Sequence, residues 1–184
     1  MQEVRNDAKQ KMEKTVEKLK QDFVKMRTGR ANPAVLNDVR VDNYGQKVAL
    51  NQVGNISTPD PKTILIQVWD KAALMEVEKA IRSAGLGLNP INDGKVIRVP
   101  VPPLSEDRRK ELVKSCKKTG EEAKVALRNV RRDVNDELKK MKDSKAISED
   151  DLKRETNEVQ KITDSFVKKI DEMVESKEKE LMTL

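Results

Sequence analysis

Apolar residues recur every three or four positions in three long stretches of the chain, and this spacing predicts three helices. The first stretch starts at Val4, and we expect Gly29 to end it. The second follows the N-cap residue Ser105 and continues for roughly 38 residues, or about 57 Å. The third follows Ser148, which begins a near capping box. The stripes consist of Val4, Ala8, Met12, Val16, Leu19, Phe23 and Met26; Leu112, Cys116, Ala123, Leu127, Val130, Val134, Leu138 and Met141; and Leu152, Val159, Ile162, Phe166, Ile170, Met173 and Leu181.

No helix can bury its own apolar stripe, so the three helices are expected to pack on one another as an antiparallel bundle. A coiled-coil partner from a second chain is the alternative. The short loop near Lys145 favours the bundle and therefore a monomer.

Residues 31–104 have a different pattern of short β-branched runs bounded by Gly, Pro, Asn or Asp. We predict strands at 39–41, 48–50, 53–57, 63–69 and 96–101, and a helix from Lys71 to Ala84. Trp69 ends a strand and is expected in the core. Tyr44-Gly45 and Gly85-Leu86-Gly87 are expected to form turns. The sequence therefore predicts an α+β fold: an elongated three-helix bundle from 1–30 and 105–184, with a small α/β, sandwich-like domain at 31–104 inserted into it.

Two chain crossings join these predicted domains, and both contain proline. One consists of Arg30, Ala31, Asn32 and Pro33, and the other contains Pro102, Pro103, Leu104 and Ser105. Proline lacks a backbone donor and restricts the residue before it, so neither flanking element can continue through the crossing. We expect the two crossings to form a hinge.

The composition argues against catalysis. Of 184 residues, 38% are charged and 2% aromatic, a balance typical of long solvated helices. The chain has one cysteine and no histidine, which excludes an internal disulfide and makes the usual zinc sites and proton shuttles unavailable. No GxxxxGK[ST] loop occurs, Cys116 lies on an apolar stripe, and most carboxylates alternate with lysines on helical faces. We therefore predict no enzyme activity, cofactor or metal. A hydrolase that uses the acidic residues is a rival hypothesis.

The absence of long apolar runs predicts a cytoplasmic protein without a membrane segment. No run exceeds four consecutive apolar residues, from Ala72 to Met75, and the first ten residues lack the apolar segment of a signal peptide.

The net charge of +6 is concentrated in the first two predicted helices. Residues 1–30 carry nine basic and five acidic side chains, 105–147 carry fourteen and nine, and 148–184 carry seven and eleven, while 31–104 are nearly neutral. On a wheel of about 100° per residue, one sector of the second helix collects Lys110, Lys114, Lys117, Lys124, Arg128, Arg131, Arg132, Lys139 and Lys142. A solvated charged face is the simplest interpretation, but the single sign favours a polyanion, either folded RNA or duplex DNA.

Several segments, taken in order, resemble the ribosome recycling factor family over essentially the whole chain. They are Lys25-Met-Arg-Thr-Gly-Arg-Ala-Asn-Pro33, Tyr44-Gly45, Leu86-Gly-Leu-Asn-Pro90, Ile97-Arg-Val-Pro-Val-Pro-Pro-Leu104, Arg128-Asn-Val-Arg-Arg-Asp133, Ile147-Ser-Glu-Asp150 and Lys177-Glu-Lys-Glu-Leu-Met182. Asn43 stands where the family usually has a first tyrosine, and Gly85 where it usually has an acidic residue.

The resemblance implies an L-shaped, tRNA-like molecule that binds the large ribosomal subunit and, with elongation factor G and its GTP hydrolysis, separates the subunits. The family's ribosomal RNA contacts correspond to Arg27, Arg109, Arg128, Arg131 and Arg132, to which the wheel adds Lys117 and Lys124. A non-ribosomal nucleic-acid-binding protein or helical scaffold is the main alternative.

Overall fold

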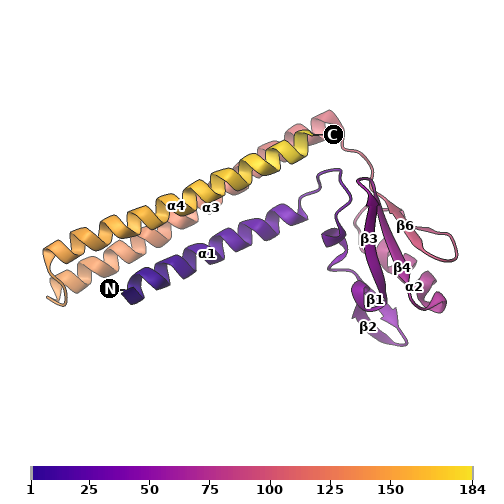
Figure 1. Cartoon of the computed structure of the whole chain (residues 1–184), viewed down its shortest axis with the longest axis horizontal. Coiled ribbons are helices and arrows are strands. Elements are labelled where there is room, and N and C mark those ends of the chain that lie inside the picture. The colour runs from indigo at the N-terminus through magenta and orange to yellow at the C-terminus, as the bar shows by residue number, and fades with distance from the viewer. Residues whose placement is uncertain (1, 184) are drawn as a thin grey trace. The chain divides into compact units, whose positions relative to one another are not determined.

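The computed structural model of the chain describes residues 2–183 and contains two compact units (Figure 1). One extends to Phe23 and resumes at Arg109, and the other extends from Val24 to Arg108. Each unit has its own apolar core, so each is described by itself.

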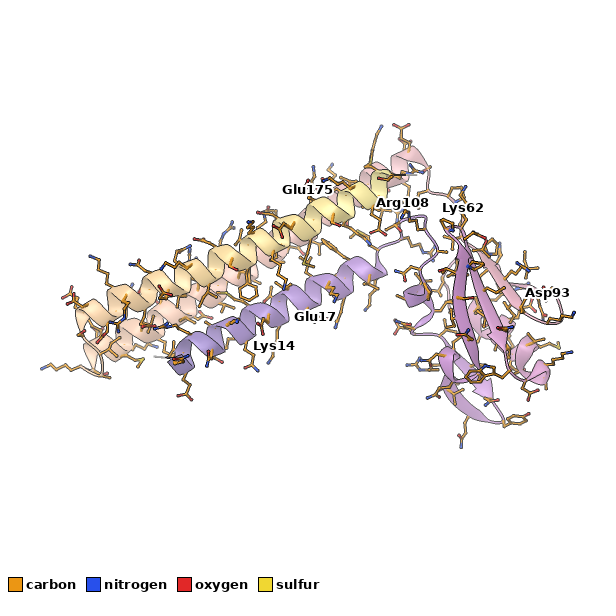
Figure 2. The ribbon with its side chains drawn as sticks, in the orientation of Figure 1. Lys14, Glu17, Lys62, Asp93, Arg108 and Glu175 are labelled. Atoms are coloured by element: carbon orange, nitrogen blue, oxygen red, sulfur yellow. The ribbon has the colours of Figure 1, made fainter. Side chains whose placement is uncertain are left out.

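The first unit is a bundle of three long helices, which confirms the predicted bundle. Helices α1 (Gln2–Lys25), α3 (Glu106–Asp143) and α4 (Glu149–Met182) lie side by side, and α3 runs opposite to the other two (Figure 1). The apolar stripes face one another, and all three helices contribute to one buried cluster, made of Ala8, Val134, Leu138 and Val159. Polar residues cover the outside; Lys14 and Glu17, for example, point away from α1 (Figure 2).

The ends of the helices follow the sequence signals with one exception. Ser148 and Asp151 form a complete capping box for α4, because the Ser148 hydroxyl accepts a bond from the Asp151 amide at 3.0 Å and the Asp151 carboxylate accepts one from the Ser148 amide at 3.3 Å. The first helix, by contrast, ends at Lys25 rather than near Gly29. The following residues pack in the other unit, where Thr28 is buried and its hydroxyl accepts a bond from the Arg30 amide at 3.4 Å.

A glycine allows α3 and α4 to approach closely. Gly120 is buried in the middle of α3, and a Cβ atom at this position would overlap the Val174 side chain of α4. Glycine is unfavourable inside a helix because it restricts the unfolded chain least. Its presence here is explained by packing rather than by helix propensity.

The second unit combines a helix with two antiparallel sheets. β1 (Arg40–Asn43) and β2 (Gln46–Ala49) form a hairpin, and β3 (Gly54–Asp60), β4 (Thr63–Val68), β6 (Ile97–Pro100) and β5 (Ile91–Asn92) form a four-stranded sheet in that order. Helix α2 (Leu74–Ser83) completes an aliphatic core with side chains from both sheets. In the register of β4 and β6, Ile64 pairs with Val99 and Ile66 with Ile97, and all four are buried. The α+β fold class is thereby confirmed.

Several local predictions in this unit need correction. Trp69 is 69% exposed rather than buried. Side chains alternate across a strand, so the inward series Ile64, Ile66 and Val68 places residue 69 on the other side. Leu50 begins a 3₁₀ helix (Leu50–Gln52) instead of ending a strand, and a second 3₁₀ turn (Lys71–Ala73) precedes α2. The sequence prediction missed the two-residue strand β5 and the 3₁₀ helix Pro33–Leu36.

The predicted turns of the second unit are confirmed. Tyr44 and Gly45 have positive φ angles of 51° and 82° between β1 and β2. Gly85 and Gly87, after α2, also have positive φ angles, of 67° and 64°.

Candidate RNA-binding surface

Three arginines form the centre of the basic face of α3. Arg128, Arg131 and Arg132 follow the helical spacing of three and four residues, so their side chains emerge as neighbours. Arg128 and Arg132 are exposed and Arg131 is half-buried, while Leu127 and Val134 on the adjoining face are buried in the bundle. No acidic side chain among residues 2–183 pairs with any of the three. This arginine cluster is therefore held on a rigid helix with its charge uncompensated.

The two predicted lysines differ from the arginine cluster because acidic side chains of α4 approach both. The Lys124 ammonium lies 2.7 Å from the carboxylates of Asp171 and Glu121, and its side chain is only 16% exposed. The hydrogen bonds that the ammonium donates to Asp171 and, second, to Glu121 raise the pKa of Lys124. Lys117 is exposed and lies 3.8 Å from Glu178. A wheel of α3 alone could not reveal these pairings, because their main partners lie on another helix.

A neutral side chain of α4 contacts the arginine cluster. The Arg131 guanidinium donates a hydrogen bond of 2.8 Å to the Gln160 Oε1 atom. Gln160 in turn donates through Nε2 to the Asp164 Oδ1 atom, also at 2.8 Å. Sequence reasoning missed both residues. Their i, i+4 spacing on one helix was the only available signal, and it does not identify a partner on α3.

The remaining predicted contacts divide between the two units. Arg109, near the start of α3, is half-buried and belongs to the bundle unit. Arg27 belongs to the other unit, where it is exposed and its guanidinium passes close to Gly87, 3.4 Å from the position that a Cβ atom would take. The structure therefore brings Arg128, Arg131 and Arg132 together and leaves Arg27 in a separate unit.

Each of the two predicted crossings is bonded to the turn between β3 and β4 at one residue. The amide of Ala31 donates to the Pro61 carbonyl at 2.7 Å, and the amide of Val101 donates to the Lys62 carbonyl at 2.8 Å. Lys62 lies at the end of this hairpin (Figure 2). Arg30, Asn32, Pro102, Pro103 and Leu104 also line a cavity of about 90 Å³. Asn32 caps the 3₁₀ helix at Pro33, and the Ser105 hydroxyl accepts a bond from the Arg108 amide at 3.2 Å.

Cys116 and the carboxylates are the remaining side chains that could carry chemistry or hold a metal ion. Within residues 2–183 no group of three or more Cys, Asp or Glu side chains is arranged to hold a metal ion. Cys116 is buried, as predicted, and burial raises the pKa of its thiol to about 11. Across the same range, no helix has the length and apolar character needed to cross a membrane.

Comparison with known proteins identifies the family. Residues 19–182 match the family described as ribosome recycling factor. This chain belongs to the ribosome recycling factor family. The ribosome-recycling factor of Solidesulfovibrio magneticus is 53% identical over 184 residues, with both chains covered completely. That of Ralstonia pickettii is 54% identical over 182 residues, covering 99% of this chain and 98% of the relative.

Solved structures give the same family. A solution structure of a ribosome recycling factor matches all of this chain and 97% of its own, with a TM-score of 0.80 and 43% identity. A second match, with a TM-score of 0.66, 45% identity and 98% coverage of both chains, describes the T. thermophilus ribosome recycling factor and the E. coli elongation factor G bound to the E. coli post-termination complex. These findings confirm the resemblance seen in the sequence, and the ribosome recycling factor family is a non-enzymatic one.

Proposed function

We propose that this protein recycles ribosomes after termination. It binds the large subunit of the post-termination complex and, together with elongation factor G and its GTP hydrolysis, promotes separation of the subunits and release of mRNA and tRNA. Membership of the ribosome recycling factor family carries the proposal, and the relative bound with elongation factor G to a post-termination complex supports both partners. It requires no cofactor of its own, because the hydrolysis belongs to elongation factor G.

The arginine cluster of α3 is the main contact with ribosomal RNA in this proposal. A guanidinium group is always charged and can donate two parallel hydrogen bonds to a phosphate. Since no acidic side chain in the described range pairs with Arg128, Arg131 or Arg132, RNA binding need not break an ion pair there. Arg27 and Arg109 are assigned by the family resemblance. Lys117 and Lys124 are secondary contacts, because carboxylates of α4 already compensate their charges.

The hinge transmits work between a ribosomal RNA-binding bundle, residues 1–30 and 105–184, and an inserted domain, residues 31–104. The bonds of Ala31 and Val101 to the β3–β4 turn support this proposal, because they fix both crossings to the inserted domain. Bending then falls close to the helix ends, where α1 ends at Lys25 and α3 begins at Glu106. The protein acts as a monomer in the cytoplasm, where bacterial ribosomes are found.

Substitution of single basic residues tests the binding surface. Arg131→Ala should weaken binding to purified large subunits by about 1–3 kcal/mol, the range for a charged hydrogen bond left unmade. Lys124→Ala should weaken it less, because its charge is already paired. Lys14→Ala, on the outward side of α1, is the matched control and should leave affinity nearly unchanged (Figure 2).

The salt dependence of binding gives a second measure. Each phosphate contact that is lost should make the plot of log affinity against log salt shallower by roughly 0.7–0.9. Equal slopes and affinities for the wild-type protein and Arg131→Ala would remove Arg131 from the surface. Binding duplex DNA as well as large subunits would favour the alternative of a non-ribosomal nucleic-acid-binding protein, and a subunit-splitting assay with elongation factor G tests recycling itself.

A further inference from the structure

We infer that Gln160, with Asp164 behind it, is a positioning residue for ribosomal RNA binding: it orients the Arg131 guanidinium from the neighbouring helix. The inference rests on the proposed function, because it assumes that Arg131 contacts RNA. It adds a part of the surface that lies on the acidic helix α4, where the distribution of charge gives no reason to look for it.

The chemistry of the three groups fixes the orientation of the Gln160 amide. A guanidinium group can only donate hydrogen bonds and a carboxylate can only accept them. Oε1 must therefore face Arg131 and Nε2 must face Asp164, and both contacts are 2.8 Å long. The reversed amide would place two donors together on one side and two acceptors on the other. The Asp164 carboxylate thus holds the amide oxygen toward α3.

This arrangement holds Arg131 without neutralising it. Arginine has five N–H donors, and the bond to Gln160 occupies only one. A long side chain loses rotamer freedom when it binds a phosphate, and a side chain that is already held loses less. A carboxylate in place of the amide would also hold the guanidinium, but it would compensate the charge that RNA requires.

The contrast with Lys124 shows why an amide is suitable. The Lys124 ammonium is held by two carboxylates, and most of its side chain is covered. A side chain of the same helix holds Arg131 through a neutral oxygen, that of Gln160. The Asp164 carboxylate bonds to Gln160 and not to Arg131. Side chains of α4 therefore hold both Lys124 and Arg131. The charge of Lys124 is compensated by carboxylates, whereas the charge of Arg131 is not.

The test is a double-mutant cycle in the full-length protein, with affinity for purified large subunits as the readout. Gln160→Met preserves the length of the side chain and every charge. It should weaken binding roughly three- to tenfold, as expected when one long side chain must be ordered on binding. The slope of log affinity against log salt should not change, because the number of neutralised phosphates is the same. In the Arg131→Ala background, Gln160→Met should have no further effect.

Two further variants separate orientation from charge. Gln160→Glu retains a bond to Arg131 but compensates its charge, so it should weaken binding more than Gln160→Met and make the salt slope shallower. Asp164→Asn keeps an acceptor for the Gln160 amide and should bind at least as well as the wild type, whereas Asp164→Ala should bind less well. Gln21→Met, the same substitution at an exposed position of α1, is the matched control. Thermal unfolding of each variant tests for a general loss of stability.

The outcomes distinguish this inference from the proposed function. If Arg131→Ala weakens binding and Gln160→Met does not, the positioning role is wrong and the RNA-binding surface stands. An equal loss from Gln160→Met with and without Arg131 would mean that Gln160 acts independently, which also overturns the inference. If Arg131→Ala leaves binding unchanged, the assignment of Arg131 to the surface and the role of Gln160 are both wrong.

Discussion

The two compact units of this protein use charge in different ways. In the Val24–Arg108 unit, an aliphatic core is enclosed between α2 and the sheets, and the charged side chains are half-buried or exposed. In the bundle, the apolar stripes are narrow and charged groups cross between helices, as Arg5 does to Glu155 and Lys124 to Asp171. Cations on the bundle therefore serve two purposes: some hold helices together, and others remain available for a polyanion. Net charge alone cannot separate the two.

Deleting the inserted domain, residues 31–104, is the strongest test of this difference between the two units. Joining residue 30 to residue 105 with a short flexible linker leaves α1, which ends at Lys25, and α3, which begins at Glu106, complete. We expect this bundle to unfold cooperatively and to bind large subunits with the wild-type salt slope, because the arginine cluster is intact. Subunit splitting with elongation factor G should be abolished, since the inserted domain is absent.

Far-ultraviolet circular dichroism and thermal unfolding establish first that the shortened chain is folded. If the folded bundle splits ribosomes at the wild-type rate, the inserted domain has no part in transmitting work. If it is folded and does not bind, the RNA-binding surface is not confined to the bundle.

An ion pair between helices in which one partner is buried should contribute more to stability than a fully exposed pair. Glu155 is 1% exposed and accepts two bonds from Arg5 of α1, at 2.5 and 2.6 Å. Glu155→Ala should reduce the free energy of unfolding by about 2 kcal/mol, within the range for a charged hydrogen bond lost from a buried site. Glu17→Gln, on the outward side of α1 (Figure 2), should change it by less than about 0.5 kcal/mol. Chemical denaturation at neutral pH measures both.

Because of the same ion pair, the free energy of unfolding should depend on pH in acidic solution. The bonds from Arg5 hold the pKa of the Glu155 carboxyl below its ordinary value of 4.5. A lowered pKa means that the stabilisation is fully present above pH 4.5 and is lost as pH falls through the lowered value. The stability difference between the wild type and Glu155→Gln should therefore be constant from neutral pH down to about 5 and shrink in more acidic solution. A difference that stays constant to pH 3 would contradict the role of the charge.

Close packing of α3 on α4 should oppose helix propensity at Gly120. In an exposed helix, replacing glycine with alanine stabilises by about 1 kcal/mol. Here the added Cβ meets the stiff, β-branched Val174 side chain, so Gly120→Ala should instead destabilise by about 1–2 kcal/mol. Val174→Ala should relieve the overlap, making the double variant less destabilised than the sum of the two single variants. Ser115→Ala, at an exposed position of the same helix, is the control and should be neutral or slightly stabilising.

The sequence predicted the elements of the bundle well because their periodicity is long and regular. The helix expected after Ser105 has the predicted 38 residues, and the capping box at Ser148 forms as expected. The end of α1 was harder to predict from the sequence. Gly29 does have a positive φ angle of 77°, but the helix ends before it because the intervening residues pack in the other unit. That packing involves residues distant in sequence, so a local signal such as a glycine at the end of a helix cannot predict it.

The candidate site was predictable in position but not in detail. The wheel placed Arg128, Arg131 and Arg132 on one face, and the structure keeps them adjacent without acidic partners in the described range. The wheel could not distinguish Lys124 from them, because Asp171 is remote in sequence. For the same reason it could not find Gln160. The role of the hinge stays a prediction until motion of the units is measured.

Substitution of Trp69 should have the smallest effect on stability. It tests whether the core of the second unit covers only one face of the four-stranded sheet. The side chain is 69% exposed, while Ile66 on the same strand is fully buried. Trp69→Gln should change the free energy of unfolding by less than about 0.5 kcal/mol, as for other exposed positions. Ile66→Ala, the control from the inner face, should reduce the free energy of unfolding by about 2–5 kcal/mol.

The fluorescence of Trp69 gives a second measurement, because it is the only tryptophan in the sequence. Its emission in the wild type should shift little on unfolding and should be readily quenched by acrylamide in the native state. A loss of stability comparable to that of Ile66→Ala, or a native emission protected from the quencher, would mean that another surface covers the outer face of the sheet in solution. The contrast between a one-sided aliphatic core and a charge-bridged bundle would then fail for the second unit.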